Sequence, residues 1–143
     1  MRTVLPSRLL KLSLVVDAVA SGALALLQVV APDALGRLLT LPPGLLLETG
    51  VFLVGYTLLL VVMARSERLW SPLVAFIVVG NVGWAAGCAA LLGTGVLEPN
   101  WLGLAFVSMQ ALAVLAFAAA EYLGLRQSAP AYGRATQGWQ SGS

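Results

Sequence analysis

Apolar residues form four long runs along this chain, separated by short polar breaks that contain proline or glycine. The runs cover 9–30, 45–64, 69–92 and 101–125. Each approaches the ~20 residues that a helix needs to cross about 30 Å of hydrocarbon. The runs are continuous rather than alternating, which favours helices over the strands of a barrel. The pattern therefore predicts an all-α polytopic membrane protein, with four transmembrane helices in a compact bundle over residues 1–126.

The two segments outside this pattern have different characters. In the loop 31–44, the sequence predicts a short helix lying on the outer membrane surface, with Asp33 capping it and Leu35, Leu38 and Leu39 on one side. The segment 127–143 is small, polar and free of acidic residues, which is typical of a disordered cytoplasmic tail. Its Tyr132 and Trp139 are either partner-docking anchors or ordinary aromatic residues of a flexible tail.

Composition agrees with a membrane location. The chain is 59% hydrophobic and 10% charged, with a mean hydropathy of +0.92, whereas soluble domains carry about 25% charged residues. The net charge of +2 comes from scattered basic residues and does not indicate nucleic-acid binding. With a single cysteine and no histidine, the usual metal and haem ligand sets are missing. We expect no metal and no cofactor.

Lysine and arginine fall unevenly on the two sides of the predicted bundle. Seven of the eight lie on the side of the N-terminus and one lies opposite, at Arg37. The seven are Arg2, Arg8, Lys11, Arg65, Arg68, Arg126 and Arg134. Because basic loops stay in the cytoplasm, both termini are predicted to be cytoplasmic.

Two carboxylates interrupt the apolar runs, and helical spacing places each on a polar stripe. Asp17, Ser21 and Gln28 share one face of the first helix, and Gln110 and Glu121 share one face of the fourth. Asp17 is six residues from Lys11 and Glu121 is five from Arg126, so both carboxylates lie at a similar depth. They are therefore candidates for one shared intramembrane site.

Three interpretations of this pair remain open. Arg8 or Lys11 could pair with Asp17, and Arg126 with Glu121, so that the site only fixes helix register. Alternatively, the two acids could share a proton or bind a cation. General acid–base catalysis is the weakest interpretation, because the sequence supplies neither a nucleophile nor metal ligands beside them.

The third run adds further polar and small residues. Asn81 shares a face with Trp84 and Cys88, at a depth comparable to Tyr56 and Gln110, and these side chains predict either interhelical hydrogen bonds or a small pocket. Close helix packing is predicted at small residues spaced along two helices: Ala18, Gly22, Gly80, Gly83 and Gly87.

The segments "DAVASGAL" (17–24), "GNVGW" (80–84) and "MQALAVLAFAAAEYLGLR" (109–126) resemble a family of small, uncharacterised bacterial integral membrane proteins with four predicted helices. The resemblance implies the four-helix architecture and a bacterial inner (cytoplasmic) membrane. It implies no activity and no catalytic residues.

Taken together, these features predict a non-enzymatic membrane protein. The first hypothesis is an accessory or assembly-stabilising subunit that packs beside a larger membrane complex. The alternative is a small oligomeric transporter or channel, active as a homo-oligomer, that uses Asp17 and Glu121 as a proton or cation site.

Overall fold

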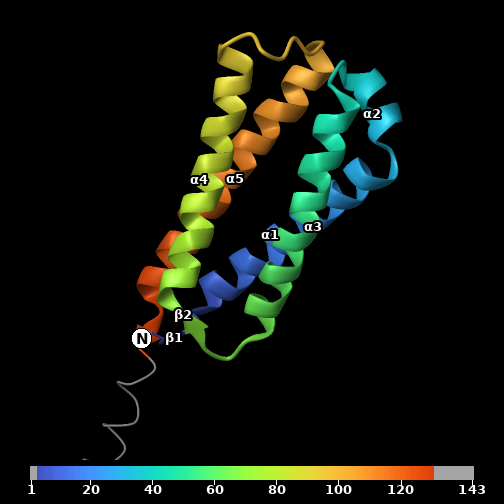
Figure 1. Ribbon diagram of the computed structural model, residues 1–143. Helices are drawn as coiled ribbons and strands as arrows, with labels where there is room; N and C mark the ends of the chain where they lie inside the picture. Colours follow the sequence, from blue (N-terminus) through green and yellow to red (C-terminus); the bar gives the residue numbers. More distant parts are fainter. Residues whose placement is uncertain (1–2, 131–143) are drawn as a thin grey trace, which may run out of the picture.

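A computed structural model describes residues 3–130 of the chain, which contain five helices and three very short strands (Figure 1). The elements are, in order, β1 (Thr3–Leu5), α1 (Arg8–Val30), α2 (Pro32–Leu39), α3 (Pro43–Arg65), β2 (Leu69–Trp70), α4 (Ser71–Gly93), α5 (Trp101–Gln127) and β3 (Ala129–Pro130).

Four of these helices, α1, α3, α4 and α5, are long and apolar enough to cross a membrane. Their ends lie within two residues of the ends predicted from the apolar runs. Much of their apolar surface is exposed, as at Val19, Val79 and Leu112, and lipid would cover such a surface in a bilayer.

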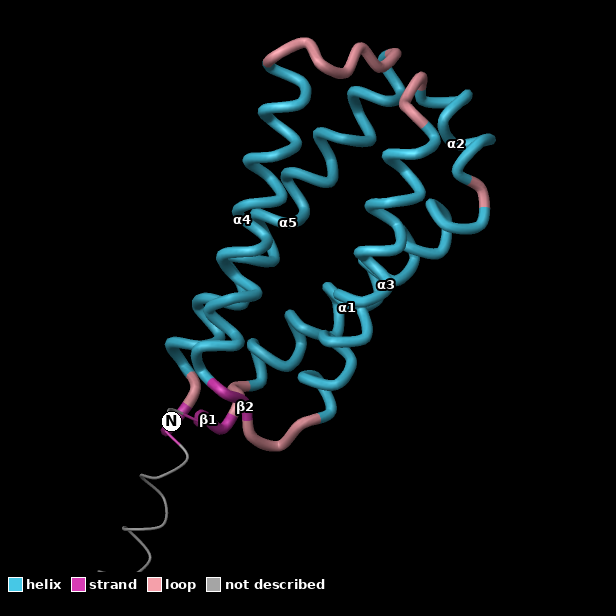
Figure 2. The backbone as a smooth tube through the Cα atoms, viewed as in Figure 1, coloured by secondary structure: helices cyan, strands magenta, loops and turns pink. Residues whose placement is uncertain are grey.

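The described residues are predominantly helical, as expected, but one end of the molecule also carries a small sheet that the sequence did not predict. β1 pairs with both β2 and β3 in a small antiparallel sheet, shown in magenta in Figure 2. Leu69 and Trp70 were predicted to begin the third long helix, but they form β2 because α4 starts at Ser71 with Pro72 in its first turn. The sheet brings the N-terminal segment, the α3–α4 connection and residues 129–130 to the same end.

The short helix predicted in the loop 31–44 is present as α2, with a different start and a different buried face. Its N-cap is Ala31, and Asp33 lies in the first turn without capping it, because Pro32 already occupies the first helical position. Leu35 and Leu39 are buried, but Leu38 is exposed. The α2 helix is held to the start of α5, where the Asn100 side-chain amide donates to the Leu38 carbonyl at 2.8 Å.

The four long helices are arranged as two pairs that meet along one side only. The α1 helix packs against α3 and α5, and α4 packs against α5, whereas α4 and α3 do not pack closely along their lengths (Figure 1). At the α1–α5 contact the backbones touch: a side chain at Gly124 would meet the Leu10 backbone nitrogen at 2.6 Å. One apolar core, around Leu10 and Leu60, lies near the sheet, and a second, around Leu39 and Leu46, lies near α2.

Candidate functional site

Polar side chains from all four long helices meet in the interior. We call Asp17 and Ser21 of α1, Tyr56 of α3, Asn81 of α4 and Glu121 of α5 the carboxyl cluster. Ser21 donates to Asp17 Oδ1 at 2.8 Å. The Asn81 amide nitrogen lies 3.0 Å from Glu121 Oε2 and 3.4 Å from Asp17 Oδ2, so one amide group bridges the two carboxyl groups.

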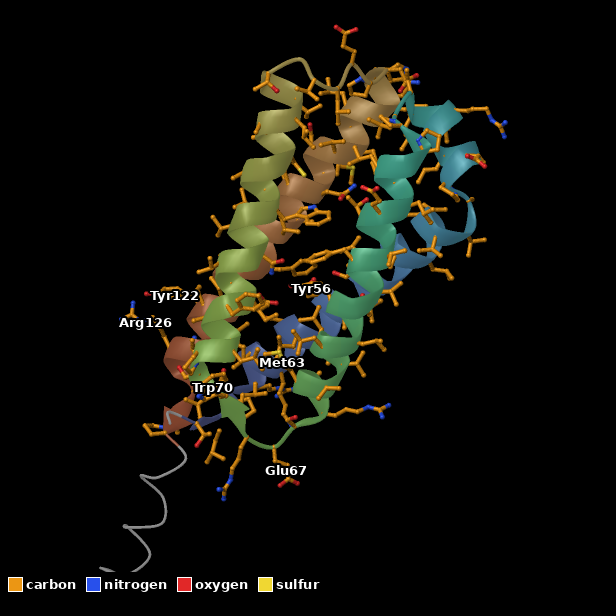
Figure 3. The ribbon with its side chains drawn as sticks, viewed as in Figure 1. Tyr56, Met63, Glu67, Trp70, Tyr122 and Arg126 are labelled. Carbon is orange, nitrogen blue, oxygen red and sulfur yellow. The ribbon has the colours of Figure 1, made fainter. Side chains whose placement is uncertain are left out.

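Tyr56 connects the cluster to the other helix pair. Its hydroxyl lies 2.9 Å from Asp17 Oδ2 and 3.0 Å from Asn81 Oδ1, and its single proton is donated to one of these atoms at a time. The side chain extends from α3 toward α4 across the space between the helix pairs (Figure 3). The cluster therefore joins helices whose backbones do not pack against each other here.

Both carboxyl groups are completely buried, with 0% of Asp17 and of Glu121 exposed. Within residues 3–130, their hydrogen-bond partners are the hydroxyl and amide groups of the cluster and include no lysine or arginine. Arg126, in the last turn of α5, instead points away from the bundle, with its guanidinium 5.9 Å from the centre of the Tyr122 ring (Figure 3). Among the described residues, Asp17 and Glu121 thus lack the ion pairs expected if the acids only fixed helix register.

The two carboxyl groups lie close together, because Asp17 Oδ2 and Glu121 Oε2 are both within 3.4 Å of the Asn81 amide nitrogen. Glu121 Oε1 is buried and has no hydrogen-bond partner among the described residues. The geometry therefore suits a pair that holds one proton, because two adjacent anions would repel strongly in a medium of low polarity.

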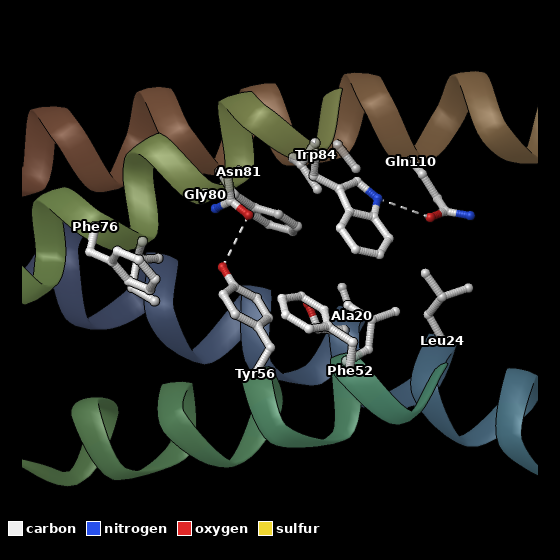
Figure 4. Close-up of a pocket in the computed structure, with 15 residues that line it drawn as sticks. Ala20, Leu24, Phe52, Tyr56, Phe76, Gly80, Asn81, Trp84 and Gln110 are labelled. Atoms are coloured by element: carbon white, nitrogen blue, oxygen red, sulfur yellow. Dashed lines mark hydrogen bonds between the residues drawn. The ribbon is translucent and has the colours of Figure 1, made fainter. Parts of the chain in front are cut away.

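A cavity of about 150 Å³ lies beside the cluster, lined by all four long helices (Figure 4). Ser21, Tyr56 and Asn81 form part of its wall, so the residues that bind the carboxyl groups also face this space. On the side away from the cluster, Phe52 of α3 stacks on Trp84 of α4, with ring centres 5.8 Å apart. The Trp84 indole nitrogen donates to Gln110 Oε1 at 3.4 Å.

A second hollow, of about 340 Å³, continues from this cavity toward α2. The two spaces share Trp84 and Gln110 in their walls. Gly83 and Gly87 of α4 line the second hollow, and a Cβ at either position would meet no atom within 4 Å. Together the spaces form an apolar groove between the two helix pairs.

The residues proposed from sequence are placed in three different ways. Asp17, Ser21, Asn81 and Glu121 meet in the cluster, and Gln110 lies along the groove. Gln28 lies outside the cluster, in the wall of the second hollow near α2, where it accepts a hydrogen bond from Thr49 at 2.8 Å. Tyr56 was expected from its depth to join interhelical hydrogen bonds or line a small pocket, and its side chain does both. No spacing rule in the sequence shows that its hydroxyl reaches Asp17.

The small residues predicted to mark close helix packing are also divided. Ala18 is buried in the core near the sheet, and a side chain at Gly22 would meet Thr57 of α3 at 3.2 Å. Gly80, Gly83 and Gly87 are exposed, with open space where a side chain would lie. Tyr132 and Trp139, the proposed docking residues, lie outside the described residues.

Comparisons of the chain with protein-family models, curated protein sequences and solved structures gave no match. The expected membership of a bacterial membrane-protein family therefore remains a prediction from the sequence. Within the described residues, no group of three or more His, Cys, Asp or Glu side chains is arranged to hold a metal ion. The arguments about function below rest on the carboxyl cluster and the groove.

Proposed function

We propose that this chain is a small, non-enzymatic membrane transporter or channel whose proton or cation site is the pair Asp17 and Glu121. The observation that carries the proposal is the complete burial of two adjacent carboxyl groups whose described partners are all neutral. Intramembrane acids are costly, so they are commonly kept for function and commonly pair with a base when their role is structural.

The arrangement of the helices supports movement around this site. The α3 and α4 helices are linked near the cluster by the Tyr56–Asn81 hydrogen bond and the Phe52–Trp84 stack. These are side-chain contacts, which break more easily than a packed helix interface. Opening them would expose the cluster to the groove, while α1 and α5 stay joined through the close contact at Gly124. A homo-oligomer could complete the lipid-facing side of the groove.

The proposed location is the bacterial inner (cytoplasmic) membrane, with both termini in the cytoplasm. It is supported by the four long apolar helices and by the basic residues near the sheet end, such as Arg8, Lys11 and Arg126.

Proton movement in reconstituted vesicles tests the proposal. The full-length protein would be placed in vesicles that contain a pH-sensitive dye and a potassium ionophore for charge balance, and the outside would be acidified. We expect faster internal acidification with the wild type than with the Asp17→Asn, Glu121→Gln double variant. Glu48→Gln, which changes an exposed carboxylate on α3, is the matched control. Equal rates for the wild type and the double variant would contradict the proposal.

A second candidate function, an accessory subunit of a larger membrane complex, is favoured by a different observation. The α4 surface around Gly80, Gly83 and Gly87 is exposed and open, and glycines at such spacing let a partner helix approach closely. A photo-crosslinking amino acid at Gly87 should then join the chain to one partner in the native membrane. The same amino acid at Val19, on the exposed face of α1, should give no such product. Equal crosslinking from both positions would contradict the subunit role.

A further inference from the structure

The cavity beside the carboxyl cluster combines aromatic walls with buried acids. Five aromatic side chains line it: Phe52, Tyr56, Phe76, Trp84 and Phe117 (Figure 4). None of the described side chains that line it is basic. The combination matters because the faces of aromatic rings attract cations, most strongly where water is excluded.

We propose that this cavity binds a small organic ammonium ion that carries an aromatic or branched apolar group, in exchange for the proton held by Asp17 and Glu121. The inference rests on the proposed function, because it assigns a class of ligand to the same carboxyl pair. The exchange balances charge: one cation enters the cavity, and one proton leaves the carboxyl pair for the solvent.

The charges around the cavity favour this exchange. The ionisable groups of the cluster are Asp17 on α1, Tyr56 on α3 and Glu121 on α5, and α4 contributes the neutral Asn81. When the shared proton leaves, two buried negative charges remain with no described basic neighbour. A cation in the cavity would be separated from them only by the Ser21, Tyr56 and Asn81 side chains, which form the wall.

The size of the space limits the ligand. A cavity of about 150 Å³ matches the volume at which an apolar protein cavity accepts a benzene-sized molecule, about 150 Å³. A longer apolar group has room to extend past Trp84 into the neighbouring hollow of about 340 Å³. The walls are predominantly apolar and lie beside acids, so anionic and strongly hydrated ligands fit poorly.

Two probes of nearly identical shape test the inference. Benzyltrimethylammonium is a permanent cation, and neopentylbenzene replaces its nitrogen with carbon. Binding of each to the full-length protein in lipid nanodiscs would be measured by equilibrium dialysis against empty nanodiscs. We expect the cation to bind at least about tenfold more tightly, with one proton released to a weakly buffered solution for each cation bound. Equal binding, or cation binding without proton release, would overturn the inference.

Variants identify the site of binding. Asp17→Asn with Glu121→Gln should abolish both the preference for the cation and the proton release. Phe117→Leu keeps the wall apolar but removes an aromatic face. It should therefore weaken binding of the cationic probe more than binding of the neutral probe. Leu112→Ala, on the exposed face of α5, is the control and should change neither. If the double variant fails to fold, the comparison of probes on the wild type still decides the inference.

The outcomes also separate this inference from the proposed function. Vesicle acidification that depends on the carboxyl pair, without any preference for the cationic probe, would contradict the proposed ligand class but still support the proton site. If neither carboxyl-dependent acidification nor a preference for the cationic probe is observed, the proposed function is contradicted as well.

Discussion

At the residue scale, the structure turns a sequence expectation into a specific arrangement of atoms. Helical spacing was sufficient to predict that Asp17 and Glu121 lie at one depth on inward faces, and both are completely buried. It could not predict that Asn81 bridges them, since that contact depends on how α4 is rotated and placed against α1 and α5. The sequence also could not decide whether Lys11 pairs with Asp17 and Arg126 with Glu121. Closeness in sequence does not fix the direction in which these side chains point.

The first prediction concerns the proton. We expect infrared spectroscopy of the wild type in lipid, at neutral pH, to show the carbonyl stretch of a protonated carboxyl group. The reason is that Asp17 and Glu121 are completely buried on either side of one Asn81 amide, and a proton on one of them removes the repulsion between two buried charges. The band should disappear in the Asp17→Asn, Glu121→Gln double variant and persist in Glu48→Gln. A wild-type spectrum without the band would show that both acids are ionised.

The second prediction concerns the bridging amide. Asn81→Leu should lower the free energy of unfolding by about 1–3 kcal/mol, because it leaves buried polar groups without their partner. Asn81 donates toward both carboxyl groups and accepts from Tyr56. Thermal unfolding in detergent would measure the effect, with Val79→Ala on the exposed face of the same helix as the control. An unchanged midpoint for Asn81→Leu would mean that the cluster adds little to stability.

At the element scale, the apolar runs predicted the long helices well, because a span of fixed thickness sets their length. The small sheet was missed: β2 and β3 are two residues each, too short for any alternation to show in the sequence. Glycine spacing was also a poor guide to contact. Gly83 and Gly87 have the favoured interval but face open space, whereas Gly124 and Gly103, outside that motif, meet neighbouring backbone.

The third prediction follows from this contrast between glycines. Gly124→Ala should destabilise the protein by about 1–3 kcal/mol, because the added methyl group would press on backbone that cannot move aside cheaply. The clash is with Leu10, whose backbone nitrogen lies 2.6 Å from the position that the alanine Cβ would occupy. Gly55→Ala, in the interior of α3 with nothing within 4 Å, should instead stabilise by about 0.5–1 kcal/mol. Unfolding midpoints that shift equally in both variants would contradict the close α1–α5 contact.

At the scale of the whole molecule, the two helix pairs create both the site and its access. A bundle closed on all sides would bury the carboxyl cluster permanently, but α3 and α4 are separated by the groove and bridged by side chains. Composition predicted the membrane environment because lipid-facing helices must be apolar throughout. It could not predict the groove, which depends on which helices pack together.

The last prediction is the orientation of the whole chain. The sheet end carries the N-terminal segment and the α3–α4 connection at 66–70, while the α4–α5 connection at 94–100 lies at the other end. Basic residues at the sheet end predict that this end lies in the cytoplasm. Cysteine variants would be made in a Cys88→Ala background, in cells whose outer membrane is permeabilised and whose inner membrane is intact. A membrane-impermeant maleimide added to these cells should label Thr94→Cys. It should label Ser66→Cys only after the inner membrane is opened. The reverse labelling pattern would contradict the prediction and show that the basic end of the molecule lies outside the cell. Labelling of both sites in intact cells would rule out an arrangement in which these connections lie on opposite sides of the membrane.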